Sequence, residues 1–131
     1  MVQRFHHRIC ELSGGDINVI NGPDEMLLCG LSMGADAGIG STYNLMSGEY
    51  VKLYNCFTAG DFAGAQQQQY KINYMVEVIL RHGLFPTLKH VLTVKGFDAG
   101  YPVFPGKRFT PAEEDALMKD LDAIRFFEDY R

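Results

Sequence analysis

The chain has 131 residues, 47% hydrophobic and 21% charged, which is the ordinary balance of one globular domain with one core. Its net charge of -4 and the lack of a basic stripe argue against nucleic acid as a partner. No apolar run approaches the roughly 20 residues of a membrane span, and charges interrupt the N-terminus, unlike a signal peptide. A cytoplasmic protein without membrane contact is therefore expected.

The first third of the chain predicts two short strands that alternate with helices. Apolar residues at helical spacing cover about 2–12, and Gly14 and Gly15 follow them as a helix end would. Residues 17–20 predict a strand, and a helix is expected over 25–34, with Pro23 opening its first turn. The small apolar run at 35–40 predicts a second strand. Two strands joined by a helix are expected to be parallel.

The rest of the chain predicts four helices, at about 47–57, 61–82 and 85–94 and from Thr110 onward, where a capping box begins. The long helix carries one mostly apolar stripe, and its QQQQ run at 66–69 is interpreted as helix surface. Residues 98–109 predict a loop, and its part 104–109 is interpreted as solvated, with a small basic anion site as the alternative. The stripe of the long helix consists of Phe62, Ala65, Gln69, Ile72, Val76 and Ile79. The last helix is expected to bury Leu117, Leu121, Ile124 and Phe127.

Unusual residues follow both predicted strands. Gly22, Asp24 and Glu25 come after the first strand, and Gly40 and Ser41 end the second. The carboxyl ends of parallel strands meet at one edge, which is the face that carries active sites in barrels of alternating strands and helices. Carboxylates accept hydrogen bonds and a hydroxyl both donates and accepts, so this set suits a sugar or polyol. Helix-start and strand-end chemistry is the plainer alternative for both segments.

No metal site is expected. Cys10, Cys29 and Cys56 fit neither a disulfide framework nor the spacing of a metal site, so they are interpreted as reduced core thiols. His6 and His7 are adjacent, so on a helix they point about 100° apart and cannot chelate one ion together.

From about residue 5 onward, the chain resembles the C-terminal part of the N-acetylneuraminate lyases, a branch of the dihydrodipicolinate synthase superfamily of class I aldolases. The resemblance is carried by NGPDE at 21–25 and GADAGIGSTYN at 34–44, with GD at 60–61, GLF at 83–85 and LK at 88–89. It implies an α/β fold. Residues 1–60 would form the last two βα units of a (β/α)8 TIM barrel with the preceding helix, and 61–131 a C-terminal helical extension.

The resemblance also implies roles for the site residues. Gly22 would contact the substrate through its backbone, Asp24 and Glu25 would bind the hydroxyls of the sugar, and Ser41 would contact the substrate. Gly40 would keep the backbone open near the reacting end. The family often carries a larger, sometimes aromatic, residue where this chain has Pro23, so one wall of the pocket is expected to differ.

The reaction implied is the reversible cleavage of N-acetylneuraminate to pyruvate and N-acetylmannosamine through a lysine Schiff base, in a homo-oligomer and without a cofactor. In the family the Schiff-base lysine lies on the sixth barrel strand, the proton-relay tyrosine on the fifth and the carboxylate-binding hydroxyls after the second. By this resemblance the chain would begin in the helix after the sixth strand. We therefore expect no catalytic residue in it and no lyase activity from the chain alone.

Two alternatives stay open. The chain could belong to a related aldolase that uses another sugar-like or 2-keto acid substrate, although the paired carboxylates favour a polyhydroxylated one. It could also be a non-catalytic module that associates through its helices or an exposed strand edge, because two parallel strands alone leave both edges bare.

Overall fold

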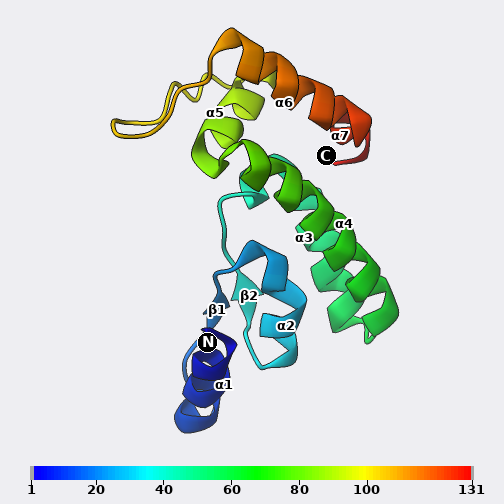
Figure 1. Cartoon of the computed structure of the whole chain (residues 1–131). Helices are drawn as coiled ribbons and strands as arrows, with labels where there is room; N and C mark the ends of the chain where they lie inside the picture. Colours follow the sequence, from blue (N-terminus) through cyan, green and yellow to red (C-terminus); the bar gives the residue numbers. More distant parts are fainter. Residues whose placement is uncertain (1, 131) are drawn as a thin grey trace.

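The structure, a computed structural model, describes residues 2–130 of the chain, with side chains from Arg8 onward. Figure 1 shows an elongated arrangement, with α1 and the strands at one end and α5 and α6 at the other. The elements in chain order are α1 (Val2–Ser13), β1 (Ile20–Asn21), the 3₁₀ helix η1 (Asp24–Met26), α2 (Leu27–Ser32), β2 (Ala37–Gly38), α3 (Tyr43–Thr58), α4 (Phe62–His82), α5 (Leu84–Val94), α6 (Pro111–Ala123) and α7 (Phe126–Asp129).

The two strands form a parallel pair, as predicted, in which Ile20 pairs with Ala37. They are shorter than the predicted 17–20 and 35–40. A side chain explains why the pairing does not extend to the residues before Ile20 and Ala37. The Val19 N–H donates to the side-chain Oδ2 of Asp36 at 2.7 Å, while the Asp36 N–H donates to the Val19 carbonyl at 2.8 Å. A carboxylate therefore takes the place of one bond of the ladder and stops the sheet there.

The helices beside the strands differ from their predicted bounds. The helix expected over 25–34 is divided into η1 and α2, and Pro23 precedes η1 in an extended conformation (φ -67°, ψ 118°). The next helix, α3, begins four residues earlier than predicted. Its backbone leaves helical geometry at Met46 (φ -143°, ψ 44°), so Tyr43 begins a short first turn before the regular part of α3.

The core lies mainly between α3 and α4, which run side by side in Figure 1, and α5, α6 and α7 extend it. Asp61 caps α4 as its side chain accepts the Gly64 N–H at 2.9 Å. The predicted apolar stripe of α4 is confirmed at its buried members, but Phe62 at the first turn is 58% exposed. The stripe residues that are buried are Ala65, Gln69, Ile72, Val76 and Ile79.

The predicted last helix is two helices. Arg125 adopts the left-handed region (φ 52°) and separates α6 from α7, so five helices follow β2 rather than four in the described part of the chain. Leu117 and Leu121 are buried as predicted. The break changes the face that α7 presents, so Phe126 enters the core while Phe127 stays half-buried. Residues 97–110 contain no helix or strand, as predicted.

The cysteines are free thiols, but the prediction that all three belong to the core is wrong. Cys29 is exposed, and Cys10 and Cys56 are half-buried. Within residues 2–130, no helix is both long and apolar enough to cross a membrane. No group of three metal-ligating side chains occurs among the described side chains, and those of His6 and His7 lie outside them.

Candidate functional site

All five candidate residues line one open cavity of about 250 Å³ at the carboxyl ends of the strands. Segments far apart in sequence build it: η1 and the residue pair before it, the segment that follows β2, and the C-terminal half of α4 with the start of α5. Its lining is Gly22, Pro23, Asp24, Glu25, Gly40, Ser41, Thr42, Val76, Leu80 and Leu84. The cavity therefore has a polar side from the strand ends and an apolar side from the helices.

Asp24 is anchored on the polar side by Thr42. Its Oδ2 accepts the Thr42 backbone N–H at 3.0 Å and the Thr42 hydroxyl at 2.5 Å. The Tyr50 hydroxyl lies 2.6 Å from Thr42 Oγ, and because Thr42 gives its one proton to Asp24, Tyr50 is the donor. Burial raises the pKa of Tyr50 well above its ordinary value, which keeps that proton in place at neutral pH.

The other carboxylate oxygen of Asp24 lies against Gly40. A Cβ built on Gly40 would lie 1.5 Å from Asp24 Oδ1, well inside any allowed contact. Glycine at this position therefore lets the segment after β2 approach the carboxylate directly. No hydrogen bond to Oδ1 occurs among the described residues, so this oxygen is the one that could accept a bond from a ligand.

Glu25 and Ser41 are half-buried at the same cavity, and their side-chain oxygens make no hydrogen bond within the described part of the chain. Gly22 is exposed, and the space where its Cβ would lie is open. The arrangement thus presents one carboxylate, one free carboxylate oxygen, a hydroxyl and bare backbone to the same volume. Such groups can bind several hydroxyls of one ligand.

A glutamine of α4 holds the segment that carries both carboxylates. Gln69 is 6% exposed, its Oε1 accepts the Leu28 N–H at 2.9 Å, and its Nε2 donates to the Asp24 carbonyl at 3.3 Å. Nε2 also donates to Asn73 Oδ1 at 2.9 Å. The interpretation of the glutamine run as helix surface is therefore wrong for its last member, which joins α4 to η1 and α2.

The sequence predicted the five candidate residues, which line one cavity, but it did not predict the contacts of Thr42 and Gln69 or the apolar wall. Thr42 stands inside the motif that was singled out, directly after Ser41. Gln69 carried a signal too, because it is the one polar residue in the apolar stripe of the long helix. Val76, Leu80 and Leu84 carried no such signal, because any apolar residue on α4 or α5 is expected to belong to the core.

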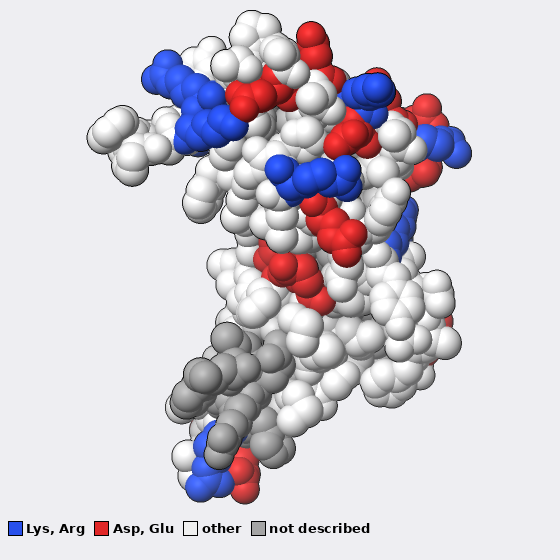
Figure 2. Space-filling model, in the orientation of Figure 1, with Lys and Arg blue, Asp and Glu red and all other residues white. Residues whose placement is uncertain are grey.

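Figure 2 shows that red and blue atoms gather over the end that holds α5, α6 and α7 on the face in view. No lysine lines the cavity. The cavity therefore offers hydrogen-bond acceptors but, among its lining residues, no amine that could attack a carbonyl carbon.

Comparison with known proteins places the chain in context. Residues 2–124 match the model of the dihydrodipicolinate synthetase family. An N-acetylneuraminate lyase from Proteus mirabilis is 27% identical with a TM-score of 0.84, over 95% of this chain and 42% of that one. The Fusobacterium nucleatum enzyme, solved with pyruvate, is 28% identical with a TM-score of 0.83, over 92% and 41%.

A putative dihydrodipicolinate synthetase from Pseudomonas aeruginosa is 25% identical with a TM-score of 0.79, over 93% of this chain and 42% of that one. The chain thus spans about two fifths of the length of the structures that it matches. Its α/β fold, mostly helical around a parallel pair of strands, corresponds to part of the barrel of these proteins. On the family match over nearly its whole length, the chain belongs to the dihydrodipicolinate synthetase family.

Proposed function

We propose that the chain is the C-terminal segment of an N-acetylneuraminate lyase and that its cavity binds the polyhydroxylated part of N-acetylneuraminate or N-acetylmannosamine. The observation that carries the proposal is the meeting of Asp24, Glu25 and Ser41 at one cavity. Asp24 and Glu25 accept hydrogen bonds from sugar hydroxyls, Ser41 donates or accepts, and Gly22 and Gly40 allow close approach of the backbone. The likeness to two lyases of this specificity supports the same substrate class.

Under this proposal residues 1–60 supply the last two βα units of a TIM barrel with the helix before them, and 61–131 form a helical extension. Exposed apolar side chains around the strands support it, because a neighbouring part of a barrel would cover them. Ile39, directly after β2, is 70% exposed, and Ile17 and Ile20 are exposed as well.

The carbon–carbon bond is cleaved through a Schiff base between a lysine amine and the ketone carbon of the substrate. Because no lysine lines this cavity, the amine and the groups that bind the pyruvate end belong to the remainder of the barrel. The chain by itself then binds sugar without cleaving it. Assembly as a homo-oligomer in the cytoplasm is proposed from the family likeness.

A related aldolase with another 2-keto acid substrate is the second candidate, favoured by the likeness to the Pseudomonas aeruginosa protein. The two candidate substrates would differ in the groups that they place against the polar side of the cavity. Two adjacent carboxylates suit a ligand with several hydroxyl donors, whereas a substrate with few hydroxyls would leave Glu25 without a partner. A non-catalytic module that associates with other chains is the third reading.

Titration of the isotopically labelled chain with N-acetylmannosamine, followed by NMR, tests the proposal. Saturable shifts at residues 22–25 and 40–42 are expected, and Glu25→Gln should weaken binding roughly 10-fold because it removes a charged acceptor. Glu128→Gln on α7 makes the same chemical change away from the cavity and should leave binding unaltered. Shifts spread evenly over the surface, or equal binding by both variants, would contradict the proposed site.

A second measurement concerns the chemistry. Borohydride treatment of the chain with pyruvate should give no adduct in the mass spectrum, because reduction traps only an imine that has formed. A full-length family lyase treated in the same way is the positive control. An adduct on one of the chain's own lysines would overturn the assignment of the amine to the rest of the barrel.

A further inference from the structure

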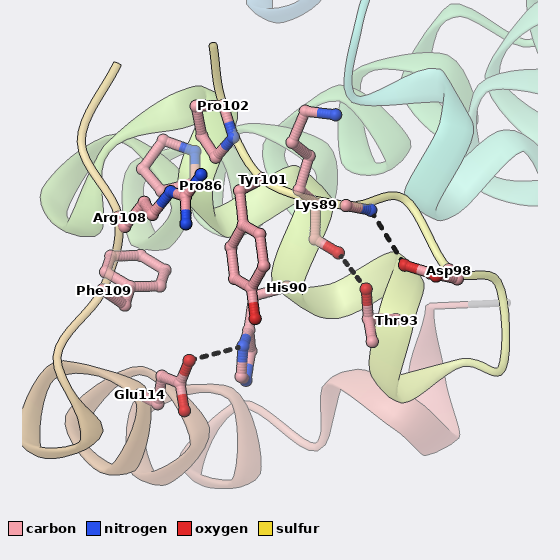
Figure 3. A pocket seen from close by; sticks show the side chains of 11 residues that line it. Pro86, Lys89, His90, Thr93, Asp98, Tyr101, Pro102, Arg108, Phe109 and Glu114 are labelled. Carbon is pink, nitrogen blue, oxygen red and sulfur yellow. Dashed lines mark hydrogen bonds and ion pairs between the residues drawn. The ribbon is translucent and has the colours of Figure 1, made fainter. Parts of the chain in front are cut away.

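A second cavity, of about 290 Å³, lies at the other end of the molecule between α5, the loop that follows it and the start of α6. Figure 3 shows that its lining side chains come from all three segments and converge on one hollow. Two prolines, Pro86 and Pro102, and the rings of Tyr101 and Phe109 make flat apolar walls. The volume is at the small end for ligand pockets, which limits an occupant to about one ring with its substituents.

Arg108 supplies a cation at one end of this cavity. Its guanidinium lies over the Tyr101 ring, 4.5 Å from the ring centre, and it forms no ion pair with the described residues. The other arginines with described side chains, Arg8, Arg81 and Arg125, all pair with carboxylates. A planar guanidinium held against a ring, with its donors unused by the protein, is suited to bind a carboxylate through two parallel hydrogen bonds.

The base of the cavity is polar. His90 Nδ1 lies 3.5 Å from Glu114 Oε1, and its ring meets the Phe109 ring edge to face with centres 6.1 Å apart. In Figure 3 the Tyr101 hydroxyl points toward His90. These groups can bond a hydroxyl or an N–H of an occupant whose ring lies between the walls.

One negative group of the lining, Asp98, lies away from Arg108. Figure 3 shows Asp98 at the opposite side of the cavity, where its Oδ1 accepts the Gly100 N–H at 3.0 Å. Lys89 donates to the Ala99 carbonyl at 2.6 Å and so ties the loop to α5. The lining therefore carries Arg108 at one end and acceptors at its base and far side, and its second cation, Lys89, is hydrogen-bonded to the loop.

From these contacts we infer that the cavity between α5, residues 97–110 and α6 binds a small planar carboxylate that carries a hydrogen-bond donor at its other end. The carboxylate bonds Arg108, the ring lies between Tyr101 and Phe109, and the donor faces His90 and Glu114. The site shares no lining residue with the sugar cavity, so the inference does not depend on the proposed function.

Titration of the whole chain with 4-hydroxybenzoate, followed by NMR, tests the inference. Saturable shifts are expected at His90, Tyr101 and Arg108, and 4-hydroxybenzamide, the neutral analogue, should bind at least 10-fold more weakly. Arg108→Met should lower the affinity for the acid by roughly 10-fold or more, and Arg108→Lys should recover only part of it. Lys107→Met removes the same charge from the neighbouring residue, which is not in the lining, and should bind like the unaltered chain.

The outcomes separate cleanly. Binding that requires both the carboxylate and Arg108 establishes the site. Equal binding of the acid and the amide, equal weakening by Arg108→Met and Lys107→Met, or no saturable shift at His90 and Tyr101 would each overturn it. Because Arg108 is exposed, its variants should keep the fold, and the unperturbed amide signals of α3 and α4 verify this in the same spectra.

Discussion

Gly40 shows how closely single residues determine the candidate site. The space that any larger side chain would fill is taken by a carboxylate oxygen of Asp24, and the other oxygen is held by Thr42. The hydroxyl of Tyr50 completes this chain of hydrogen bonds behind the cavity. The segment after β2 and the start of η1 are thereby joined through a side chain rather than through the sheet, which ends before them.

Gly40→Ala is expected to lower the free energy of unfolding by about 1–3 kcal/mol, the usual cost of forcing an atom into an occupied space. Displacement of Asp24 should also abolish the sugar-induced NMR shifts. Urea unfolding measures the first effect. Gly22→Ala is the matched control, because neither Gly22 nor Gly40 has a positive φ and a Cβ at Gly22 meets open space. The free energy of unfolding of this variant should be nearly unaltered. Equal loss in both variants would show that Asp24 is not confined by Gly40.

At the scale of elements, α4 is the support of the site. It packs along α3 in the core, and from the same face Gln69 reaches the backbone of η1 and α2, more than 40 residues earlier in the chain. The short helix α2 has only six residues, too few to be stable by itself. Its position, and that of the two carboxylates before it, depends on this buried amide.

Gln69→Leu keeps the approximate size of the side chain but leaves the Leu28 N–H and the Asp24 carbonyl without these partners. A loss of about 1–3 kcal/mol in the free energy of unfolding is expected, because unpaired buried polar groups keep their full desolvation cost. Gln67→Leu, at an exposed position of the same glutamine run, should alter stability by less than about 0.5 kcal/mol. Denaturant titrations of both variants compare them, and similar losses would contradict a bridging role for Gln69.

Over the whole molecule, a buried carboxylate with two lysine partners connects the two long helices to the C-terminal end. Glu49 of α3 is almost completely buried and lies 3.0 Å from Lys71 Nζ of α4 and 2.8 Å from Lys52 Nζ. Lys71 also donates to the Asp129 carbonyl at 2.6 Å, and the Tyr130 hydroxyl donates to the Lys71 carbonyl at 3.1 Å.

This buried carboxylate makes stability depend on pH. Burial alone would raise the pKa of Glu49, but hydrogen bonds from Lys52 and Lys71 outweigh it and hold that pKa below its ordinary value of 4.5. A carboxyl whose pKa is lower in the folded state stabilises the fold above its unfolded pKa, and this contribution is lost as the pH falls through the folded value. Stability should therefore fall below about pH 4.5, partly because of Glu49.

Glu49→Gln should reduce stability at pH 7 and make the acid side of the stability profile less steep, as measured by urea midpoints between pH 3 and pH 7. Glu77→Gln, at an exposed position of α4, is the matched control. It should leave the stability at pH 7 and the steepness of the acid side nearly unaltered. A profile for Glu49→Gln that runs parallel to that of the unaltered chain would show that another carboxyl accounts for the pH dependence.

Much of the secondary structure could be predicted from sequence because its signals are local. Apolar spacing located α4 and α5 to within about a residue, and the capping box located the start of α6. The five candidate residues were predicted to meet because the ends of parallel strands share an edge, and they do line one cavity. The left-handed turn at Arg125 and the end of the sheet at Val19 could not be predicted, because neither residue type signals them locally.

The sequence by itself determined the positions of α4 and α5, where the carboxylates and the serine stand along the chain, and the family to which their motifs belong. Only the tertiary structure decided how those groups are held: Asp24 against Gly40 and Thr42, and the segment of both carboxylates against Gln69. The physical reason is the separation along the chain. A periodic pattern reports which face of a helix is buried, but a hydrogen bond between residues 18 or 45 positions apart exists only once folding has brought its donor and acceptor together.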